Sequence, residues 1–139
     1  MAERLDLELG ADLGEIGRLA EAVEAFGERL SLPMKTVFNL NLAFDELITN
    51  TISYGLTGDG DGKIHVSVTY GDGELVSEIV DAGRPFDPFA EAPPPALTSA
   101  VAERPIGGLG VHLVKTLIDE VEYRREDGRN HIVLRQSVA

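Results

Sequence analysis

The chain has 139 residues, 43% of them hydrophobic, which fits one globular domain spanning residues 1–139. Its formal net charge of −12 argues against nucleic acid and anionic membranes as partners, because both are negatively charged, and favours a protein partner with a basic surface. The chain has no cysteine, so disulfides and thiolate metal sites are excluded. Met1–Asp6 has no signal-peptide pattern and no apolar run reaches about 20 residues, so a cytoplasmic location is expected.

The first half of the chain predicts one strand followed by two helices. Residues 5–9 alternate apolar and charged side chains, which is typical of a half-buried strand. Apolar residues at helical spacing predict a helix over residues 13–30, with Asp12 as its cap. A second helix is expected over residues 34–54, and Gly55 is expected to end it.

The second half predicts two hairpins separated by a long loop and a short helix. Strands over residues 64–69 and 75–80 flank a turn and form the first hairpin. Residues 87–106 are rich in proline and form a loop long enough to act as a lid. A helix is expected over about 109–118, and the final hairpin spans residues 121–136.

This order of elements predicts an α/β (α+β) two-layer sandwich. Strands that follow one another through short turns form an antiparallel or mixed sheet, and helices on one face bury its apolar side. The strict strand–helix alternation of a doubly wound sheet is absent. We therefore expect a mixed, mostly antiparallel sheet that is covered on one face by helices.

Glu46 and Asn50 are the first candidates for chemistry. They stand one turn apart in the second predicted helix, so their side chains are neighbours. Glu46 can serve as a general base, and Asn50 offers a neutral oxygen ligand for Mg²⁺. A solvated polar face is the alternative explanation for this spacing.

Two glycine-containing segments supply the rest of the candidate site. Asp81 follows a strand, and Gly83 beside it has no Cβ, so a flat ligand can lie close to the backbone within reach of the Asp81 carboxylate. The run Gly107–Gly110 opens a helix after the long loop, and free amides at a helix start attract phosphate oxygens. No Gly-x-x-x-x-Gly-Lys-Ser/Thr pattern occurs, so a P-loop is excluded.

Three motifs stand in order along the chain, and together they resemble those of the GHKL ATPase superfamily. They are Glu46-x-x-x-Asn50, Asp81-x-Gly83-x-Pro85-Phe86-Asp87-Pro88 and Gly107-Gly108-Leu109-Gly110. Within this superfamily the chain is most similar to the anti-sigma-factor serine/threonine kinases of bacterial partner switching, also in Leu117–Val121. The resemblance covers nearly the whole chain, and it implies a GHKL-type fold with ATP and Mg²⁺ as cofactors.

The resemblance also implies a role for each matching position. Glu46 takes or orients the proton of the attacking hydroxyl, and Asn50 binds the Mg²⁺ that bridges the phosphates of ATP. Asp81 accepts a hydrogen bond from the adenine amino group, with Gly83 beside the ring. Arg104 reaches the γ-phosphate when the lid closes. The residues that hold the phosphates beneath the lid are Gly107, Gly108, Leu109 and Gly110.

One stretch departs from the family pattern. The family often places a Thr in the final hairpin, where it supports the adenine-binding Asp through water. Here Arg129-Asn130-His131 occupies that stretch. Either Asn130 substitutes for the Thr, or the selectivity for adenine is weaker.

The function implied by the resemblance is a protein kinase in a partner switch. Such a kinase phosphorylates a Ser or Thr of an anti-sigma-factor antagonist, sequesters a sigma factor and is expected to form a homodimer. The alternative is a regulatory module that binds nucleotide and switches partners without kinase activity. The presence of Glu46 beside Asn50 favours the kinase, since a module without chemistry needs no carboxylate there.

Overall fold

A computed structural model describes residues 2–56, 62–91 and 110–138 of the chain. Its sheet has five strands in the order β1-β2-β3-β5-β4, and every pair of neighbours is antiparallel. The strands are β1 (Glu3–Gly10), β2 (Lys63–Gly71), β3 (Glu74–Asp81), β4 (Glu120–Glu126) and β5 (Arg129–Ser137). The expected sheet, mixed and mostly antiparallel, is therefore antiparallel throughout the part that is described.

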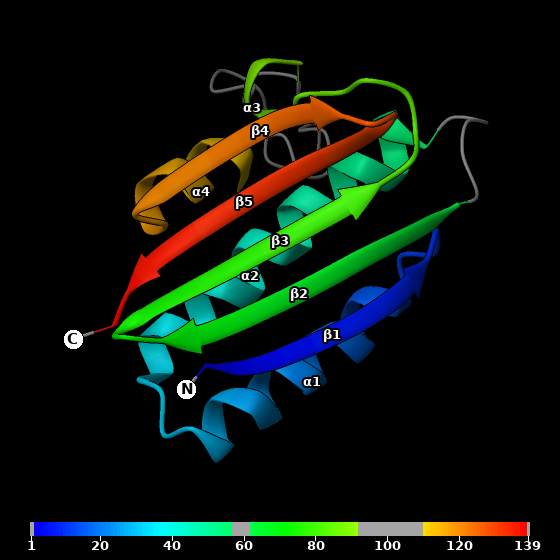
Figure 1. Ribbon diagram of the computed structural model, residues 1–139. Coiled ribbons are helices and arrows are strands. Elements are labelled where there is room, and N and C mark those ends of the chain that lie inside the picture. The colour runs from blue at the N-terminus through cyan, green and yellow to red at the C-terminus, as the bar shows by residue number, and fades with distance from the viewer. Residues whose placement is uncertain (1, 57–61, 92–109, 139) are drawn as a thin grey trace, which may run out of the picture.

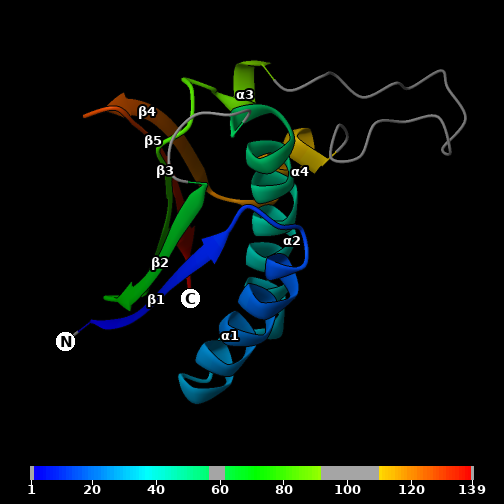
Figure 2. The ribbon, with the colours of Figure 1, turned by 90° about the vertical axis from the view of Figure 1, so that its right-hand side faces the viewer.

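The helices lie on one face of this sheet (Figures 1 and 2). They are α1 (Glu15–Arg29), α2 (Met34–Asn50), the π-helix η1 (Thr51–Gly55), α3 (Pro88–Glu91) and α4 (Gly110–Leu117). Helix α2 lies between α1 and α4 and packs against both. The predicted two-layer α+β sandwich is confirmed. Among the described residues, every helix is too short or too polar to span a bilayer.

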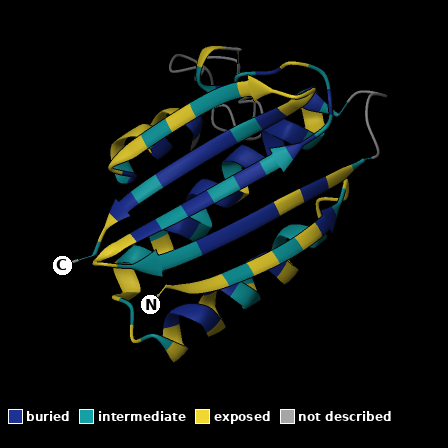
Figure 3. Cartoon of the chain, viewed as in Figure 1, coloured by how far each residue is buried: buried dark blue, intermediate teal, exposed yellow. Residues whose placement is uncertain are grey.

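The core lies between the helices and the three central strands, which carry most of the buried positions of the sheet (Figure 3). Full burial of one such side chain contributes about 1.5–3 kcal/mol, so this layer accounts for most of the cohesion of the fold. The fully buried side chains that α2 contributes are Leu40, Ala43, Phe44, Leu47 and Ile48. Those from the central strands are Ile64, Val66, Val68, Leu75, Ile79, Ile132 and Leu134.

Both hairpins turn on an Asp-Gly pair with positive φ at each residue. The values are 53° and 72° at Asp72 and Gly73, and 52° and 74° at Asp127 and Gly128. Two consecutive positive φ values are the signature of a type I′ turn, whose twist matches that of the flanking strands. The turn residues therefore fix the register within the β2–β3 and β4–β5 hairpins. The separate pairing of β3 with β5 places Asn130 opposite Asp81.

The structure corrects three of the predicted boundaries. Helix α1 starts at Glu15 rather than at residue 13, because the Asp12 carboxylate accepts a hydrogen bond from Gly14 N (2.8 Å) in the turn before the helix. The predicted helix over 34–54 is α2 continued by the π-helix η1. The short helix α3 begins the predicted loop 87–106, whose residues 92–106 lie outside the described part.

Candidate functional site

The end of α2 carries two buried oxygens without a hydrogen-bond donor. Asn50 is 1% exposed, and its Nδ2 donates to the main-chain oxygen of Glu46 over 2.7 Å. Asn50 Oδ1 and Glu46 Oε2 are buried and have no partner within the described ranges. A buried acceptor without a hydrogen bond costs about 1–3 kcal/mol. Both oxygens are therefore available to bind a cation or to accept a hydrogen bond from a ligand. A solvated polar face does not describe Asn50.

The environment of Glu46 favours its protonated form. Burial raises the pKa of the Glu46 carboxyl, and the charge of the neighbouring Asp45 raises it further. A general base is most effective when its pKa approaches the working pH. The shift is therefore in the direction that proton abstraction requires.

The donor set around Asn50 fits a Mg²⁺ ion that is held mainly by phosphates. In residues 2–56, 62–91 and 110–138, no group of three or more His, Cys, Asp or Glu side chains is arranged to hold a metal. Protein-bound Mg²⁺ usually takes only one or two side-chain ligands, and substrate phosphates and water complete its shell. The unpartnered, buried Oδ1 of Asn50 matches that pattern.

The π-helix η1 connects the end of α2 to the loop after β3. Arg84 lies in that loop, and its Nε donates to Tyr54 O over 2.8 Å. The Arg84 N–H donates to Gly55 O over 3.1 Å. π-helical turns are rare and are frequent at functional sites. Here the turn brings the helix that carries Asn50 against the loop that begins at Asp81.

Asp81 is the last residue of β3 and is 3% exposed. Its Oδ1 accepts hydrogen bonds from Gly83 N (2.9 Å) and from Asn130 Nδ2 (3.0 Å). Both bonds end on Oδ1, so Oδ2 retains its capacity to accept a hydrogen bond from a ligand. The carboxylate is thus fixed at one oxygen and available at the other.

Gly83 is required by the packing of the protein itself. A Cβ at this position would lie 2.4 Å from the main-chain oxygen of Gly55 and 2.9 Å from Leu56 Cδ2. Real Cβ atoms essentially never come so close to another atom, so a side chain would push the loop away from η1. The glycine therefore permits the contact between loop and helix, in addition to the close ligand approach predicted from the sequence.

Asn130 holds Asp81 and the loop after it together. Its Nδ2 donates to Asp81 Oδ1 and also to Arg84 O (2.8 Å), and its Oδ1 accepts from Phe86 N (3.2 Å). Asn130 is 2% exposed, so these bonds are shielded from water. Of the two possibilities raised by the departure from the family pattern, the first is supported: Asn130 contacts the Asp directly.

Two further side chains of the final hairpin complete this network. Tyr123 OH donates to Asn130 Oδ1 over 2.5 Å, and Arg125 Nη1 donates to the same oxygen over 3.2 Å. Arg125 Nη1 also donates to Gly83 O over 2.7 Å. Sequence reasoning missed both residues, although the Asp-Gly turn sets Arg125 opposite Asn130 and could have indicated it.

Most of the predicted phosphate-binding residues lie outside the part of the chain that the structure describes. Arg104, Gly107, Gly108 and Leu109 are outside the described residues. Gly110 is the first residue of α4, so a helix does begin at the end of the glycine run. Val111 and Val114 are buried, and α4 packs on α2, the helix that carries Glu46 and Asn50.

Residues 9–136 match the family model of the histidine kinase-like ATPase domain. The chain belongs to the histidine kinase-like ATPase family. The three motifs had predicted this membership, and the match spans all the strands and helices of the site.

Relatives with curated names place this histidine kinase-like ATPase among the anti-sigma-factor kinases. The serine/threonine-protein kinase BtrW of Bordetella bronchiseptica is 32% identical over 97 residues, which are 70% of this chain and 68% of that protein. The serine-protein kinase RsbW of Listeria monocytogenes is 28% identical over 133 residues, which cover 92% of this chain and 83% of that protein. The anti-sigma F factor of Clostridium botulinum is 32% identical over 110 residues, with coverage of 77% and 76%.

A solved structure supports the fold of this histidine kinase-like ATPase. The RsbU and RsbW domains of Rv1364c from Mycobacterium tuberculosis align with a TM-score of 0.69 over 98% of this chain, which spans 32% of that longer chain. At 15% sequence identity the likeness concerns the fold alone. The alignment supports the overall fold described above.

Proposed function

We propose that this anti-sigma-factor kinase binds Mg-ATP at Glu46, Asn50 and Asp81 and phosphorylates a Ser or Thr of an anti-sigma-factor antagonist. The proposal includes a cytoplasmic homodimer that sequesters a sigma factor, with the bound nucleotide deciding between the two partners. One observation carries the chemical half of the proposal. Two buried acceptor oxygens without donors, Glu46 Oε2 and Asn50 Oδ1, lie one helical turn apart at the end of α2.

Each of these residues has a separate task in the proposed reaction. Asp81 Oδ2 accepts a hydrogen bond from the amino group of adenine, while Oδ1 stays bonded to Gly83 and Asn130. Asn50 Oδ1 supplies the protein ligand for Mg²⁺. The bound ion neutralises charge on the phosphates and orients them for transfer.

Glu46 handles the proton in the transfer step. The hydroxyl oxygen of the target Ser or Thr forms a bond to the γ-phosphorus as the bond from that phosphorus to the β–γ bridging oxygen breaks. The hydroxyl proton passes to the Glu46 carboxylate, and ADP leaves with the electron pair of the broken bond. Since the carboxyl has a raised pKa, it binds this proton more readily than an exposed Glu would.

The remaining contacts to phosphate are proposed from the sequence motifs. Gly107, Gly108, Leu109 and Gly110 would line the phosphates, and Arg104 would approach the γ-phosphate from the lid. The start of α4 at Gly110 supports this assignment, since the N-terminal end of a helix attracts anions.

The proposal is tested with the chain, its cognate antagonist and Mg-ATP. Glu46→Gln is expected to abolish phosphate on the antagonist, measured by mass spectrometry, and to leave ATP affinity in titration calorimetry largely unchanged. Asp81→Asn is expected to weaken ATP binding by about 1–3 kcal/mol, because it removes an acceptor for the adenine amino group.

The same experiment separates the kinase from the regulatory module. If the Glu46→Gln chain still releases and captures its partners normally in cells, catalysis is dispensable and the module is the correct description. If the wild-type chain transfers no phosphate to the right antagonist, the kinase proposal is wrong.

A further inference from the structure

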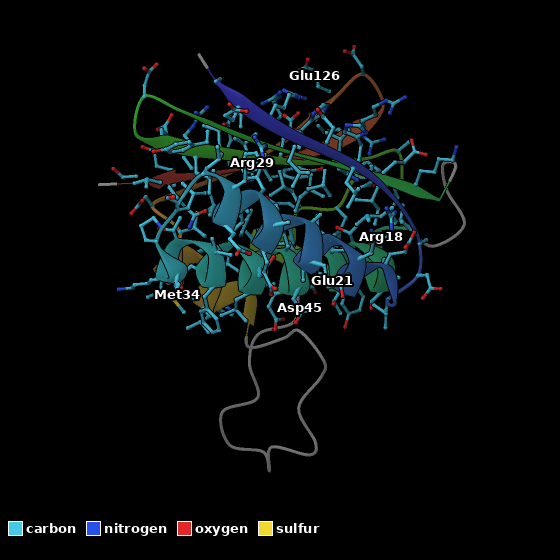
Figure 4. All side chains as sticks on the ribbon, turned by 90° about the horizontal axis from the view of Figure 1, so that it is seen from below. Arg18, Glu21, Arg29, Met34, Asp45 and Glu126 are labelled. Atoms are coloured by element: carbon cyan, nitrogen blue, oxygen red, sulfur yellow. The ribbon has the colours of Figure 1, made fainter. Side chains whose placement is uncertain are left out.

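A wide groove runs between α1 and α2 on the helical layer, and it encloses about 900 Å³. Met34 and Phe38 of α2 line it, and they are 89% and 67% exposed. Figure 4 shows Met34 and Asp45 on the side of the helices that faces away from the sheet. Neither Glu46, Asn50 nor Asp81 lines this groove, so it is separate from the proposed nucleotide site.

Small residues on α1 leave open space in the groove. Gly17 and Ala20 line it, and the position of a Cβ on Gly17 has no atom within 4 Å. The two helices meet closely at the other end, where a Cβ on Gly27 would lie 2.5 Å from Val37 Cγ2. The two helices thus touch near Gly27 and leave open space near Gly17, and apolar side chains stand on the α2 wall.

The polar residues of the groove select for a positively charged occupant. Three carboxylates line it, those of Glu24, Glu28 and Asp45, and its lining includes no Lys, Arg or His. Asn41 also lines the groove. Its Nδ2 bonds to Ala20 O (3.4 Å), but its Oδ1 is buried with no donor in the described part of the chain. An acceptor of this kind is satisfied by an N–H or ammonium group.

We propose that this groove docks an amphipathic, basic helix of a protein partner. Apolar side chains of that helix would cover Met34 and Phe38, and its Lys or Arg side chains would face the three carboxylates. The mode is that of a helix laid into a hydrophobic groove. Exposed apolar side chains on neighbouring turns of one helix commonly mark such an interaction surface.

A second copy of this chain is a poor occupant of the groove. Each copy carries a net charge of −12, and a contact through the same groove would bring two sets of carboxylates together. A homodimer of this protein would therefore use another surface. Helix α1, which forms one wall of the groove, has 15 residues and is about 22 Å long, so a partner helix of similar length would lie along it.

The test uses a fluorescent peptide of about 16 residues with Leu at helical spacing and Lys on the flanking positions. Fluorescence anisotropy with the full chain is expected to show saturable binding that weakens as salt is added. Phe38→Ser and Met34→Ser are each expected to weaken it tenfold or more. Leu113→Ser is the matched control, because Leu113 is an exposed apolar residue (41%) on α4, outside the groove.

Two further variants test the charge requirement. Replacing the three carboxylates together (Glu24→Gln, Glu28→Gln, Asp45→Asn) is expected to weaken the Lys peptide and to remove most of its salt dependence. A peptide with Glu in place of Lys is expected not to bind.

Several results would overturn the proposal. They are equal binding of the Lys and Glu peptides, an unchanged affinity of both Phe38→Ser and Met34→Ser, or a dimer in sedimentation that Phe38→Ser dissociates. The Glu46→Gln chain is expected to bind the peptide normally. Failure of the kinase proposal and failure of this one are therefore distinguishable.

Discussion

Asn130 is the residue through which the final hairpin acts on the candidate site. Its amide group donates to Asp81 and accepts from Phe86, Tyr123 and Arg125, so each of its polar atoms is used. An amide can do this because it combines a donor and an acceptor on one rigid plane. A Thr has a single hydroxyl and cannot make all these bonds at once.

Exchanging the Asn130 amide for a carboxylate tests this role. Asn130→Asp keeps an acceptor oxygen for Phe86 N and Arg125 but replaces the donor to Asp81 with a second negative charge. We expect ATP affinity to fall at least tenfold, or about 1.4 kcal/mol, because the two carboxylates repel each other. Titration calorimetry measures this loss. Asn130→Thr, which keeps a donor, is expected to lose less. Equal losses in both variants would argue that Asn130 acts only by packing.

The raised pKa of Glu46 predicts a pH dependence of stability in the nucleotide-free chain. The folded state binds the Glu46 proton more tightly than the unfolded chain does, so the protonated carboxyl stabilises the fold. That contribution is complete below the ordinary Glu pKa of about 4.3 and is lost as the pH rises through the raised value.

The comparison with Glu46→Gln isolates this effect. The Glu46→Gln chain is expected to have a higher free energy of unfolding, measured with urea, than the wild type. This difference should grow with pH and then level off. Groups that do not interact with Glu46 titrate equally in both chains and cancel in the difference. A difference that does not change with pH would contradict the assigned burial of Glu46.

At the scale of elements, the site depends on the contact between η1 and the loop after β3. Helical periodicity predicted a helix through residue 54, and the chain is helical there. The π-helical widening was not predictable, because its carbonyls bond to Arg84 in a later element of the chain. Local sequence patterns carry no information about such a distant donor.

Gly83→Ala is expected to separate these two elements. The new Cβ would collide with backbone at Gly55, so the free energy of unfolding should fall by about 1–3 kcal/mol. ATP affinity should fall with it, since Asp81 and Gly83 share a hydrogen bond. Urea unfolding and calorimetry measure the two effects.

Gly17→Ala is the control for this substitution. Its Cβ would enter open space within α1, so the chain should gain about 0.5–1 kcal/mol from the better helix propensity of Ala. A loss at Gly17 as large as that at Gly83 would show that the close contact with Gly55 is not the cause.

Local sequence patterns predicted the hairpins and the two long helices, but not how distant elements meet. Asp-Gly turns and alternating strands determined both hairpins, and apolar spacing determined α1 and α2, because these signals are local. The pairing of Asn130 with Asp81 follows from β5 lying beside β3, which no local signal encodes. The short helix α3 was missed because its cap, Asp87, sits within a proline-rich segment.

At the scale of the whole molecule, the net charge of −12 opposes the binding of ATP. A protein with this field repels an anion at long range, and a nucleotide site must overcome the repulsion locally. Mg²⁺ halves the charge of the triphosphate and binds to it. Asn50, which is neutral, adds no charge of its own to the metal site.

Removal of Mg²⁺ and addition of salt are therefore each expected to change the affinity for ATP. With EDTA present, ATP affinity is expected to fall at least tenfold, or about 1.4 kcal/mol.

Raising the salt from about 0.1 M to 1 M shortens the screening length from about 10 Å to about 3 Å. Mg²⁺-free ATP should then bind more tightly, because repulsion by the acidic chain is screened, whereas the basic peptide at the α1–α2 groove should bind less tightly. Calorimetry and anisotropy at matched salt concentrations measure both responses. If salt weakened Mg²⁺-free ATP binding as well, positive groups near the phosphates would outweigh the overall field, and the repulsion argument would fail.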